Sequence, residues 1–360
     1  MKRTKFYNAH KNLGAKIVEF AGYEMPIQYS SIIAEHKAVR NSVGVFDVSH
    51  MGEVFVKGKF ALDFVQYITT NDVSKLSSER VQYSAMCYED GGIVDDLLVY
   101  KIADDEFMLV INASNTDKDF AWMQQNNSFN VELKNLSDEY SLLAVQGPFS
   151  QKTLQKLTDT PITLEYYHFT NLNLAGIDML ISRTGYTGEL GYELYFKGDE
   201  KTALDLWDKL FEAGKEFNIQ PAGLAARDSL RLEMGFCLYG NDIDQTTNPL
   251  EAGLGWITKL AQPKFIGKES LLKIKENGLT RKLVAIISDE KIFPRHGYDI
   301  SVNNNKIGTV TSGTVSPMLD KPIALAYVDI KYAEIGTEVN FLIRGKESAA
   351  KIVRLPFVTR

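Results

Sequence analysis

Apolar and polar positions alternate along the chain in short stretches, which predicts many small elements rather than a few long ones. Apolar residues recur near helical spacing over Ser30–Val43, so we expect a helix there that Gly44 ends. The alternation in Gly44–Gly58 predicts one strand, and Phe60–Ile68 is expected to form the next helix. Strands and helices mixed in this way indicate an α+β fold.

The clearest hairpin signal surrounds Glu89-Asp-Gly-Gly92. Strands are expected over Tyr83–Tyr88 and Ile93–Ile102, because Asp-Gly and Gly-Gly pairs favour a tight turn between them. A third strand is expected over Glu106–Asn112 and a helix over Asp117–Gln125. This region therefore predicts a small antiparallel sheet with a helix beside it.

The second half of the chain continues the mixed pattern and then changes character. Further strands are predicted over 131–133, 142–145, 178–182 and 192–196, and helices over 150–157, 200–217 and 223–234. From Arg281 onward the pattern consists of short strands separated by turn signals such as Ser312-Gly-Thr. We therefore expect a separate C-terminal β domain that begins near residue 280.

Composition narrows the class of protein. A chain of 360 residues is expected to form about two or three domains. Its net charge of −6 argues against a nucleic-acid binder. The two cysteines, Cys87 and Cys237, are too few for a disulfide scaffold or a cysteine-rich zinc site. No secretory signal or bilayer-spanning segment is visible, so we expect a cytoplasmic protein without membrane partners.

Two carboxylates interrupt the apolar strand Ile93-Val-Asp-Asp-Leu-Leu-Val-Tyr100. Successive strand residues point to opposite faces, so Asp95 and Asp96 cannot face the same pocket, and Asp96 shares its face with Leu98. A carboxylate among apolar residues is expensive unless it is paired, and such positions are where acid–base groups are found. The alternative is an aspartate that accepts backbone amides near the turn.

Charged and aromatic residues give two further open alternatives. Arg227 and Arg231 lie four residues apart on a predicted helix. They form either an arginine fork for a ligand carboxylate or ion pairs with Asp228 and Glu233 that stabilise the helix. Glu193 and several tyrosines (Tyr83, Tyr100 and Tyr186) suit a flat nitrogen heterocycle, although aromatic core packing explains the tyrosines equally. Motifs for a hydrolytic triad, a zinc protease and a P-loop are absent.

Blocks along nearly the whole chain resemble the T-protein (aminomethyltransferase) family of the glycine cleavage system. The blocks include Phe20-Ala-Gly-Tyr-Glu-Met-Pro26, Gly44-Val-Phe-Asp-Val-Ser-His-Met-Gly-Glu53, Gly91-Gly-Ile-Val-Asp-Asp-Leu97, Arg183-Thr-Gly-Tyr-Thr-Gly-Glu189, Pro221-Ala-Gly-Leu-Ala-Ala-Arg-Asp-Ser-Leu-Arg-Leu-Glu233 and Leu238-Tyr-Gly-Asn-Asp-Ile-Asp244. The resemblance implies a three-domain cloverleaf around a folate channel. Its expected parts are a folate-binding domain over 1–50 and 140–278, an α+β domain over 51–139, and a β-barrel or jelly-roll-like domain over 279–360.

The resemblance also implies a reaction. The methylene of an aminomethyl group on the lipoyl arm of the H-protein passes to tetrahydrofolate, ammonia leaves, and 5,10-methylenetetrahydrofolate forms. Tetrahydrofolate is thus the expected co-substrate and lipoylated H-protein the expected partner. Neither a metal nor a nucleophilic side chain is needed, because the folate amines are the nucleophiles.

By motif matching, each site residue receives an expected role. Asp96 is the expected acid–base residue, with Asp95 structural. Glu193 would accept the N–H groups of the pterin ring, and Arg227 would contact the benzoyl-glutamate part. The other expected folate contacts are Tyr83, Tyr186, Val110, Asn112 and Met51, and Trp256 either lines the channel or packs in a core.

Two departures and three alternatives accompany this interpretation. Tyr23 stands where the family usually has Trp, and the role of the terminal Arg360 stays open. A folate-binding relative that maintains iron–sulfur proteins would carry a K-G-C-Y-x-G-Q-E motif, which is absent. A flavin-linked dehydrogenase would carry a flavin domain before the folate module, and this chain begins at that module. A non-catalytic folate-binding subunit would not need a carboxylate at Asp96.

Overall fold

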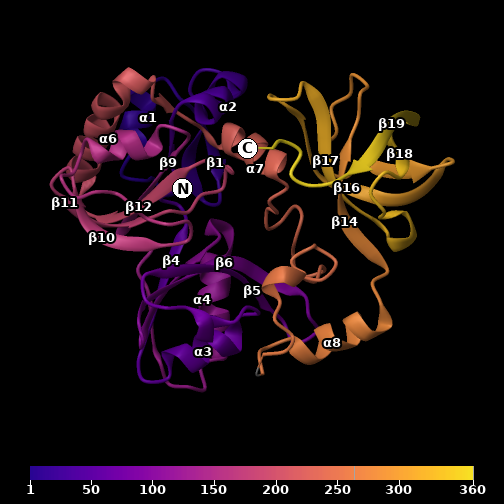
Figure 1. Ribbon diagram of the computed structural model, residues 1–360, viewed down its shortest axis with the longest axis horizontal. Helices are drawn as coiled ribbons and strands as arrows, with labels where there is room; N and C mark the ends of the chain where they lie inside the picture. The colour runs from indigo at the N-terminus through magenta and orange to yellow at the C-terminus, as the bar shows by residue number, and fades with distance from the viewer. Residues whose placement is uncertain (263, 360) are drawn as a thin grey trace. The chain divides into compact units, whose positions relative to one another are not determined.

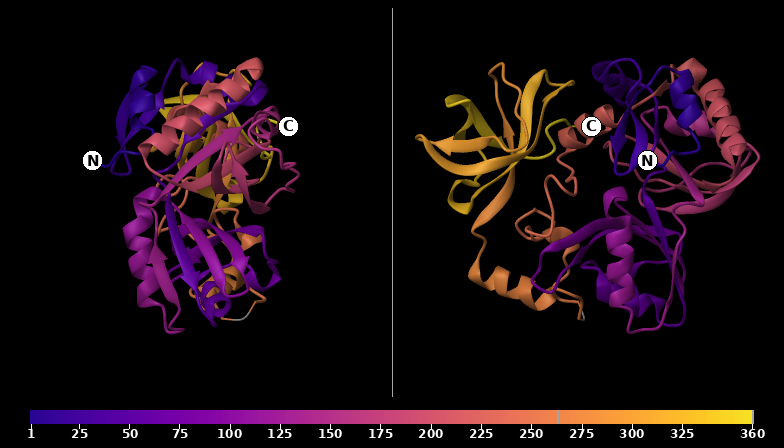
Figure 2. Two further views of the ribbon diagram at one scale, coloured as in Figure 1. Left: turned by 90° about the vertical axis from the view of Figure 1, so that its left-hand side faces the viewer. Right: turned by 180° about the vertical axis from the view of Figure 1, so that it is seen from behind.

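The computed structural model describes residues 1–262 and 264–359, so Arg360 lies outside the described residues. The chain forms two compact units. Unit 1 comprises Met1–Phe64, Ser74–Gln82 and Leu97–Asp228, and unit 2 comprises Val65–Val73, Tyr83–Asp96 and Ser229–Arg360. Figures 1 and 2 trace the chain from indigo at the N-terminus to yellow at the C-terminus. The division into three domains stays a prediction.

A six-stranded sheet forms the larger part of unit 1. Its strand order is β10-β11-β12-β9-β3-β13, with bounds Phe169–Leu174, Ile177–Ser182, Gly191–Lys197, Tyr140–Gln146, Gly44–Asp47 and Gln220–Pro221. Helix α6 (Glu200–Gly214) lies along one face of this sheet (Figure 1). Leu206 and Leu210 of α6 join Leu143 and Val145 of β9 in one core. The opposite face of β9 and β12 is therefore free to carry polar side chains.

The other elements around this sheet are short. They are α1 (Tyr7–Asn12), the hairpin of β1 (Lys16–Phe20) and β2 (Tyr23–Gln28), α2 (Ile32–Asn41) and α5 (Ser150–Gln155). Ser31 caps α2, because its side chain accepts a hydrogen bond from the backbone N–H of Ala34. The sequence pattern predicted α2 and α5 but not α1, β1, β2 or β10.

A second sheet has the strand order β5-β6-β7-β4-β8. Its strands are β5 (Arg80–Cys87), β6 (Ile93–Ala103), β7 (Glu106–Ile111), β4 (Gly52–Lys57) and β8 (Glu132–Asn135), with α3 (Ala61–Ile68) and α4 (Thr116–Gln125) between them in sequence. The predicted hairpin at Glu89-Asp-Gly-Gly92 is confirmed as β5 and β6. Both strands run from one compact unit into the other.

The prediction of one strand over Gly44–Gly58 was wrong, because this segment forms β3 and β4 in two different sheets. A turn separates them. The backbone N–H of Ser49 donates to Oδ1 of Asp47 at 3.0 Å, and the N–H of Met51 donates to the carbonyl of Val48 at 3.1 Å. An aspartate that bonds the backbone two residues on is a turn signal, and the alternation around it concealed that signal.

The predicted C-terminal β domain is confirmed as a closed six-stranded barrel in unit 2. Its order is β14-β17-β16-β15-β18-β19, with bounds Arg281–Ile287, Lys321–Asp329, Asn305–Ser316, Asp299–Val302, Glu338–Ile343 and Lys346–Val353. Figure 2 shows these strands in orange to yellow from behind. Ile286, Val310, Ala326 and Phe341 are among the residues that fill the barrel.

Three further elements connect these sheets along the chain. They are α7 (Leu224–Met234), the short helix η4 (Gly255–Ile257) and α8 (Lys268–Asn277). Within residues 1–262 and 264–359, no helix is both long and apolar enough to cross a membrane.

Candidate active site

Asp96 is held by a neighbouring tyrosine within unit 2. Oη of Tyr83, on β5, donates a hydrogen bond of 2.8 Å to Oδ2 of Asp96 on β6. Trp256 packs against Tyr83 with a ring-centroid distance of 5.9 Å, and 61% of its surface is exposed. A half-buried carboxylate with a fixed orientation beside accessible aromatic rings is suited to acid–base work on a bound ligand.

The turn between β5 and β6 fixes the position of this carboxylate. The N–H of Gly92 donates to Oδ1 of Asp90 at 2.9 Å, and the N–H of Tyr88 donates to the carbonyl of Gly92 at 2.8 Å. A Cβ on Gly92 would lie 2.1 Å from the carbonyl oxygen of Gln245, so only glycine fits. Asp95 lies on the opposite face of β6 and is fully buried.

Glu193 is the centre of a second polar cluster, within unit 1. Oε2 of Glu193 accepts hydrogen bonds from Thr184 and, at 3.4 Å, from Oη of Tyr195. Oη of Tyr100 lies 3.0 Å from Oη of Tyr195. Burial raises the pKa of Glu193, although the bonds from Thr184 and Tyr195 and the charge of Arg227 act in the opposite direction. The cluster thus presents a half-buried carboxyl group that is oriented by hydroxyl donors.

The two arginines of α7 have different surroundings. The guanidinium of Arg227 lies over the ring of Tyr186, 4.6 Å from its centroid, in unit 1. Arg231 is 1% exposed and donates to Oδ2 of Asp242 at 2.6 Å and to Oγ of Ser312 at 2.8 Å, in unit 2. Of the two alternatives left open for Arg231, the structure favours the ion-paired one, although the partner is Asp242 and not a residue of the same helix. Arg227 keeps its place as a candidate ligand contact.

The remaining predicted contacts belong to unit 1. Met51 follows the turn after β3, Val110 lies near the end of β7, and Asn112 comes directly after that strand. Met51 and Asn112 are half-buried, and Val110 is buried.

Sequence reasoning missed His50 and Glu53, which flank Met51 in the same block. Both side chains are buried, and within the described residues Nδ1 of His50 and Oε2 of Glu53 have no hydrogen-bond partner. Burial and the nearby charge of Arg227 lower the pKa of His50 to about 4, so its ring is neutral at neutral pH. The available signal was the run His50-Met-Gly-Glu53, which places polar residues just before and at the start of an apolar strand.

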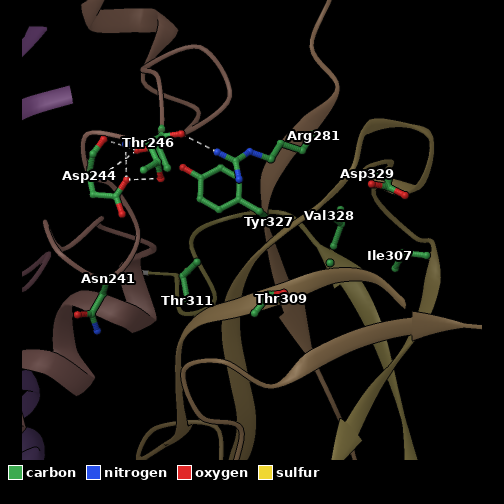
Figure 3. A pocket seen from close by; sticks show the side chains of 12 residues that line it. Asn241, Asp244, Thr246, Arg281, Ile307, Thr309, Thr311, Tyr327, Val328 and Asp329 are labelled. Carbon is green, nitrogen blue, oxygen red and sulfur yellow. Dashed lines mark hydrogen bonds between the residues drawn. The ribbon is translucent and has the colours of Figure 1, made fainter. Parts of the chain in front are cut away.

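A separate cavity in unit 2 contains none of the predicted site residues. It has a volume of about 290 Å³ and lies between the loop that carries Asp244 and the barrel strands that carry Arg281 and Tyr327 (Figure 3). Arg281 donates to Glu251 at 3.0 Å and to the carbonyl of Thr246 at 2.9 Å. The guanidinium of Arg281 is thus already paired with a carboxylate, so this cavity is not a candidate anion site. No group of three His, Cys, Asp or Glu residues in the described ranges is arranged to hold a metal ion.

Two family models together match most of the chain. The model of the GCVT N-terminal domain matches residues 6–262, and the model of the glycine cleavage T-protein C-terminal barrel domain matches residues 281–359. The second match begins and ends close to the closed barrel.

Individual relatives match over their full length. The chain is 51% identical over 359 residues to an aminomethyltransferase of Halothermothrix orenii, covering 99% of this chain and 100% of that one. It is 52% identical over 360 residues to an aminomethyltransferase of Flavobacterium psychrophilum, covering 99% of each. The crystal structure of glycine cleavage system aminomethyltransferase T from Bartonella henselae is similar with a TM-score of 0.92 and 35% identity, over 99% of this chain and 98% of that one.

Proposed function

Because this chain belongs to the glycine cleavage T-protein family, we propose that it is an aminomethyltransferase that uses tetrahydrofolate. The methylene of an aminomethyl group on the lipoyl arm of the H-protein passes to tetrahydrofolate, and ammonia leaves. The identity of about 50% over the full length of curated aminomethyltransferases supports the activity. The observation that carries the mechanism is the half-buried carboxylate of Asp96, oriented by Tyr83.

In this proposal Asp96 is the proton acceptor and stabilises the positive charge that forms during the reaction. Tetrahydrofolate supplies the nucleophilic nitrogens, so the chain needs no nucleophile of its own. The carboxylate of Asp96 accepts a proton from the attacking amine and stabilises the positive charge that develops on the transferred carbon. The hydrogen bond from Tyr83 holds the carboxylate in one orientation, and in this proposal that carboxylate faces the reacting atoms.

Unit 1 supplies the binding groups in this proposal. Glu193 accepts the paired N–H groups of the pterin ring, for which a carboxylate with two oxygens is well suited. Arg227, already stacked on Tyr186, binds the carboxylates of the glutamate part. Met51, Val110 and Asn112 contact the heterocycle. Lipoylated H-protein is the proposed partner and the cytoplasm the proposed compartment.

The test is ammonia release from aminomethyl-loaded H-protein with and without tetrahydrofolate. We expect release to depend on tetrahydrofolate and to fall at least about 100-fold in Asp96→Asn, since a neutral amide cannot exchange the proton. Tetrahydrofolate binding, measured by calorimetry, is expected to remain within about threefold.

The matched control is Asp104→Asn, which removes an exposed carboxylate that follows the same strand and pairs with Lys101. This variant is expected to turn over like the wild type. Equal turnover of Asp96→Asn and wild type would remove the assigned role, and release that ignores tetrahydrofolate would remove the proposed reaction.

A further inference from the structure

Glu53, on β4, is a buried carboxyl group that the proposed mechanism does not use. It is 1% exposed, and its Oε2 has no hydrogen-bond partner in the part of the chain that the structure describes. Most buried polar atoms in folded proteins are hydrogen-bonded, and an exception needs an explanation. A ligand that completes the hydrogen bond is one explanation, and the position of Glu53 decides in its favour.

Strand pairing places Glu53 beside a predicted ligand contact. Glu53 lies opposite Val110 in the β4–β7 pair, and Val110 lies opposite Leu98 in the β6–β7 pair. Directly opposite residues of antiparallel strands share one face of the sheet. Leu98, Val110 and Glu53 therefore form a row across three strands of the sheet.

The same face of β4 is turned toward the polar face of the six-stranded sheet. Phe55, two residues along from Glu53, stacks on Tyr140 of β9 with a centroid distance of 5.7 Å. Tyr140 shares its face with Ala144, the residue directly opposite Glu193 on β12. Glu53 and Glu193 thus lie on facing surfaces of two sheets within unit 1.

The carboxyl groups of Glu53 and Glu193 differ in whether they donate or accept hydrogen bonds. Glu193 is oriented by hydroxyl donors and is near the positive charge of Arg227. Burial raises the pKa of Glu53 well above its ordinary value, and the nearby charge of Glu193 adds to this effect. Both effects favour the neutral form of Glu53, which is a hydrogen-bond donor, whereas Glu193 has acceptor oxygens.

We infer that Glu53 is a further ligand-binding residue, whose neutral carboxyl group donates a hydrogen bond to the carbonyl oxygen of a flat heterocycle bound at Glu193. This inference rests on the proposed function. A pterin ring carries that carbonyl beside the N–H group that Glu193 is proposed to accept. Together the acceptor and the donor match the ring's edge and select its 2-amino-4-oxo form.

The experiment measures tetrahydrofolate binding by anaerobic calorimetry at pH 7 for the wild type, Glu53→Gln and Glu53→Met. Glutamine keeps a donor of the same size, and methionine keeps the length without a donor. We expect Glu53→Gln to bind within about threefold of the wild type and Glu53→Met to bind about tenfold more weakly. Glu132→Gln, at an exposed position of β8 in the same sheet, is the control and is expected to bind normally.

Two results would overturn the inference. One is wild-type affinity in Glu53→Met, which would leave Glu53 without a contact to the ligand. The other is an equal loss in both variants, which would mean that the neutral donor is not what binds. If the wild type itself fails to bind tetrahydrofolate, the proposed function fails instead, so the two failures are distinguishable.

Discussion

At the scale of single residues, the hydroxyl of Tyr83 is the group that distinguishes Asp96 from an ordinary surface aspartate. A donor to a carboxylate favours its ionised form and fixes its direction. The ring of Tyr83 is in turn packed against Trp256. The sequence interpretation assigned Tyr83 to the ligand, and the structure adds that it contacts the carboxylate directly.

We predict that Tyr83→Phe lowers kcat about tenfold and leaves tetrahydrofolate binding within about threefold, because the ring remains and only one hydrogen bond is lost. The acid limb of the pH–rate profile is expected to move to higher pH, since the pKa of a carboxylate rises when it loses a donor. Steady-state kinetics from pH 5 to 9 measure both effects. An unmoved acid limb would mean that Tyr83 acts through packing alone.

Glu53 predicts a pH-dependent stability. Burial beside Glu193 raises its pKa in the folded chain well above the ordinary value. Below that ordinary value Glu53 is protonated in both the folded and the unfolded chain, so it has no effect. As the pH rises, the unfolded chain releases the proton while the folded chain keeps it, and the wild type loses stability.

Glu53→Gln is therefore expected to melt at a higher temperature than the wild type, with a gap that widens as the pH rises above the ordinary pKa of a glutamate. Each pH unit between the two pKa values corresponds to about 1.4 kcal/mol. Scanning calorimetry at several pH values measures the gap. A constant gap would contradict the assignment of a proton to Glu53.

At the scale of elements, α7 carries two arginines on one face that perform unrelated tasks. Arg231 is buried against Asp242 and Ser312, and Arg227 lies over Tyr186. Breaking a buried ion pair by removing one partner leaves an uncompensated charge. The two positions thus form a natural pair for separating folding from ligand binding.

We predict that Arg231→Met destabilises the chain by about 3–5 kcal/mol, measured by urea unfolding. Arg227→Met is expected to change stability by less than about 1 kcal/mol and to weaken tetrahydrofolate binding at least about tenfold. The opposite pattern, with stability lost at position 227 and binding lost at 231, would reverse the roles assigned to the two side chains.

The elements that the sequence predicted correctly are those with a local cause. The β5–β6 turn has Asp90 and two glycines, and the structure uses Gly92 where no side chain fits. The strand break after Asp47 also has a local cause, but alternation on both sides concealed it. Strands β1 and β2 are mostly half-buried or exposed, so they lack the apolar periodicity that marks a strand.

The residues of the candidate site also divide into those with a local sequence signal and those whose role depends on the tertiary fold. The carboxylates of β6 had a sequence signal, because they interrupt an apolar strand, but the choice of Asp96 over Asp95 came from the family resemblance and stays a prediction. The partner of Arg231 was not predictable, since Asp242 lies in a loop and the pairing depends on the tertiary fold. The run His50-Met-Gly-Glu53 was the only local signal for Glu53, and its proximity to Glu193 could not be predicted, because the two residues lie on strands about 140 residues apart in sequence.

At the scale of the whole molecule, ligand binding and folding are linked. A ligand that binds only the folded chain adds about 2.7 kcal/mol of stability at 100 times its Kd. We therefore predict that tetrahydrofolate at this excess raises the melting temperature by several degrees. The increase should be reduced in Arg227→Met at the same concentration. An equal increase in both proteins would show that Arg227 does not contribute to binding.

The closed barrel also affects how readily the protein aggregates. A strand at the edge of a sheet can pair with another chain and begin a fibre, whereas a closed barrel exposes no such edge. One edge strand of each larger open sheet has polar exposed positions, which are Asn171 and Asn173 on β10 and Glu132 and Lys134 on β8. Resistance to aggregation at these two edges therefore depends on a few amide and charged side chains, while the barrel strands are free to be as apolar as their packing requires.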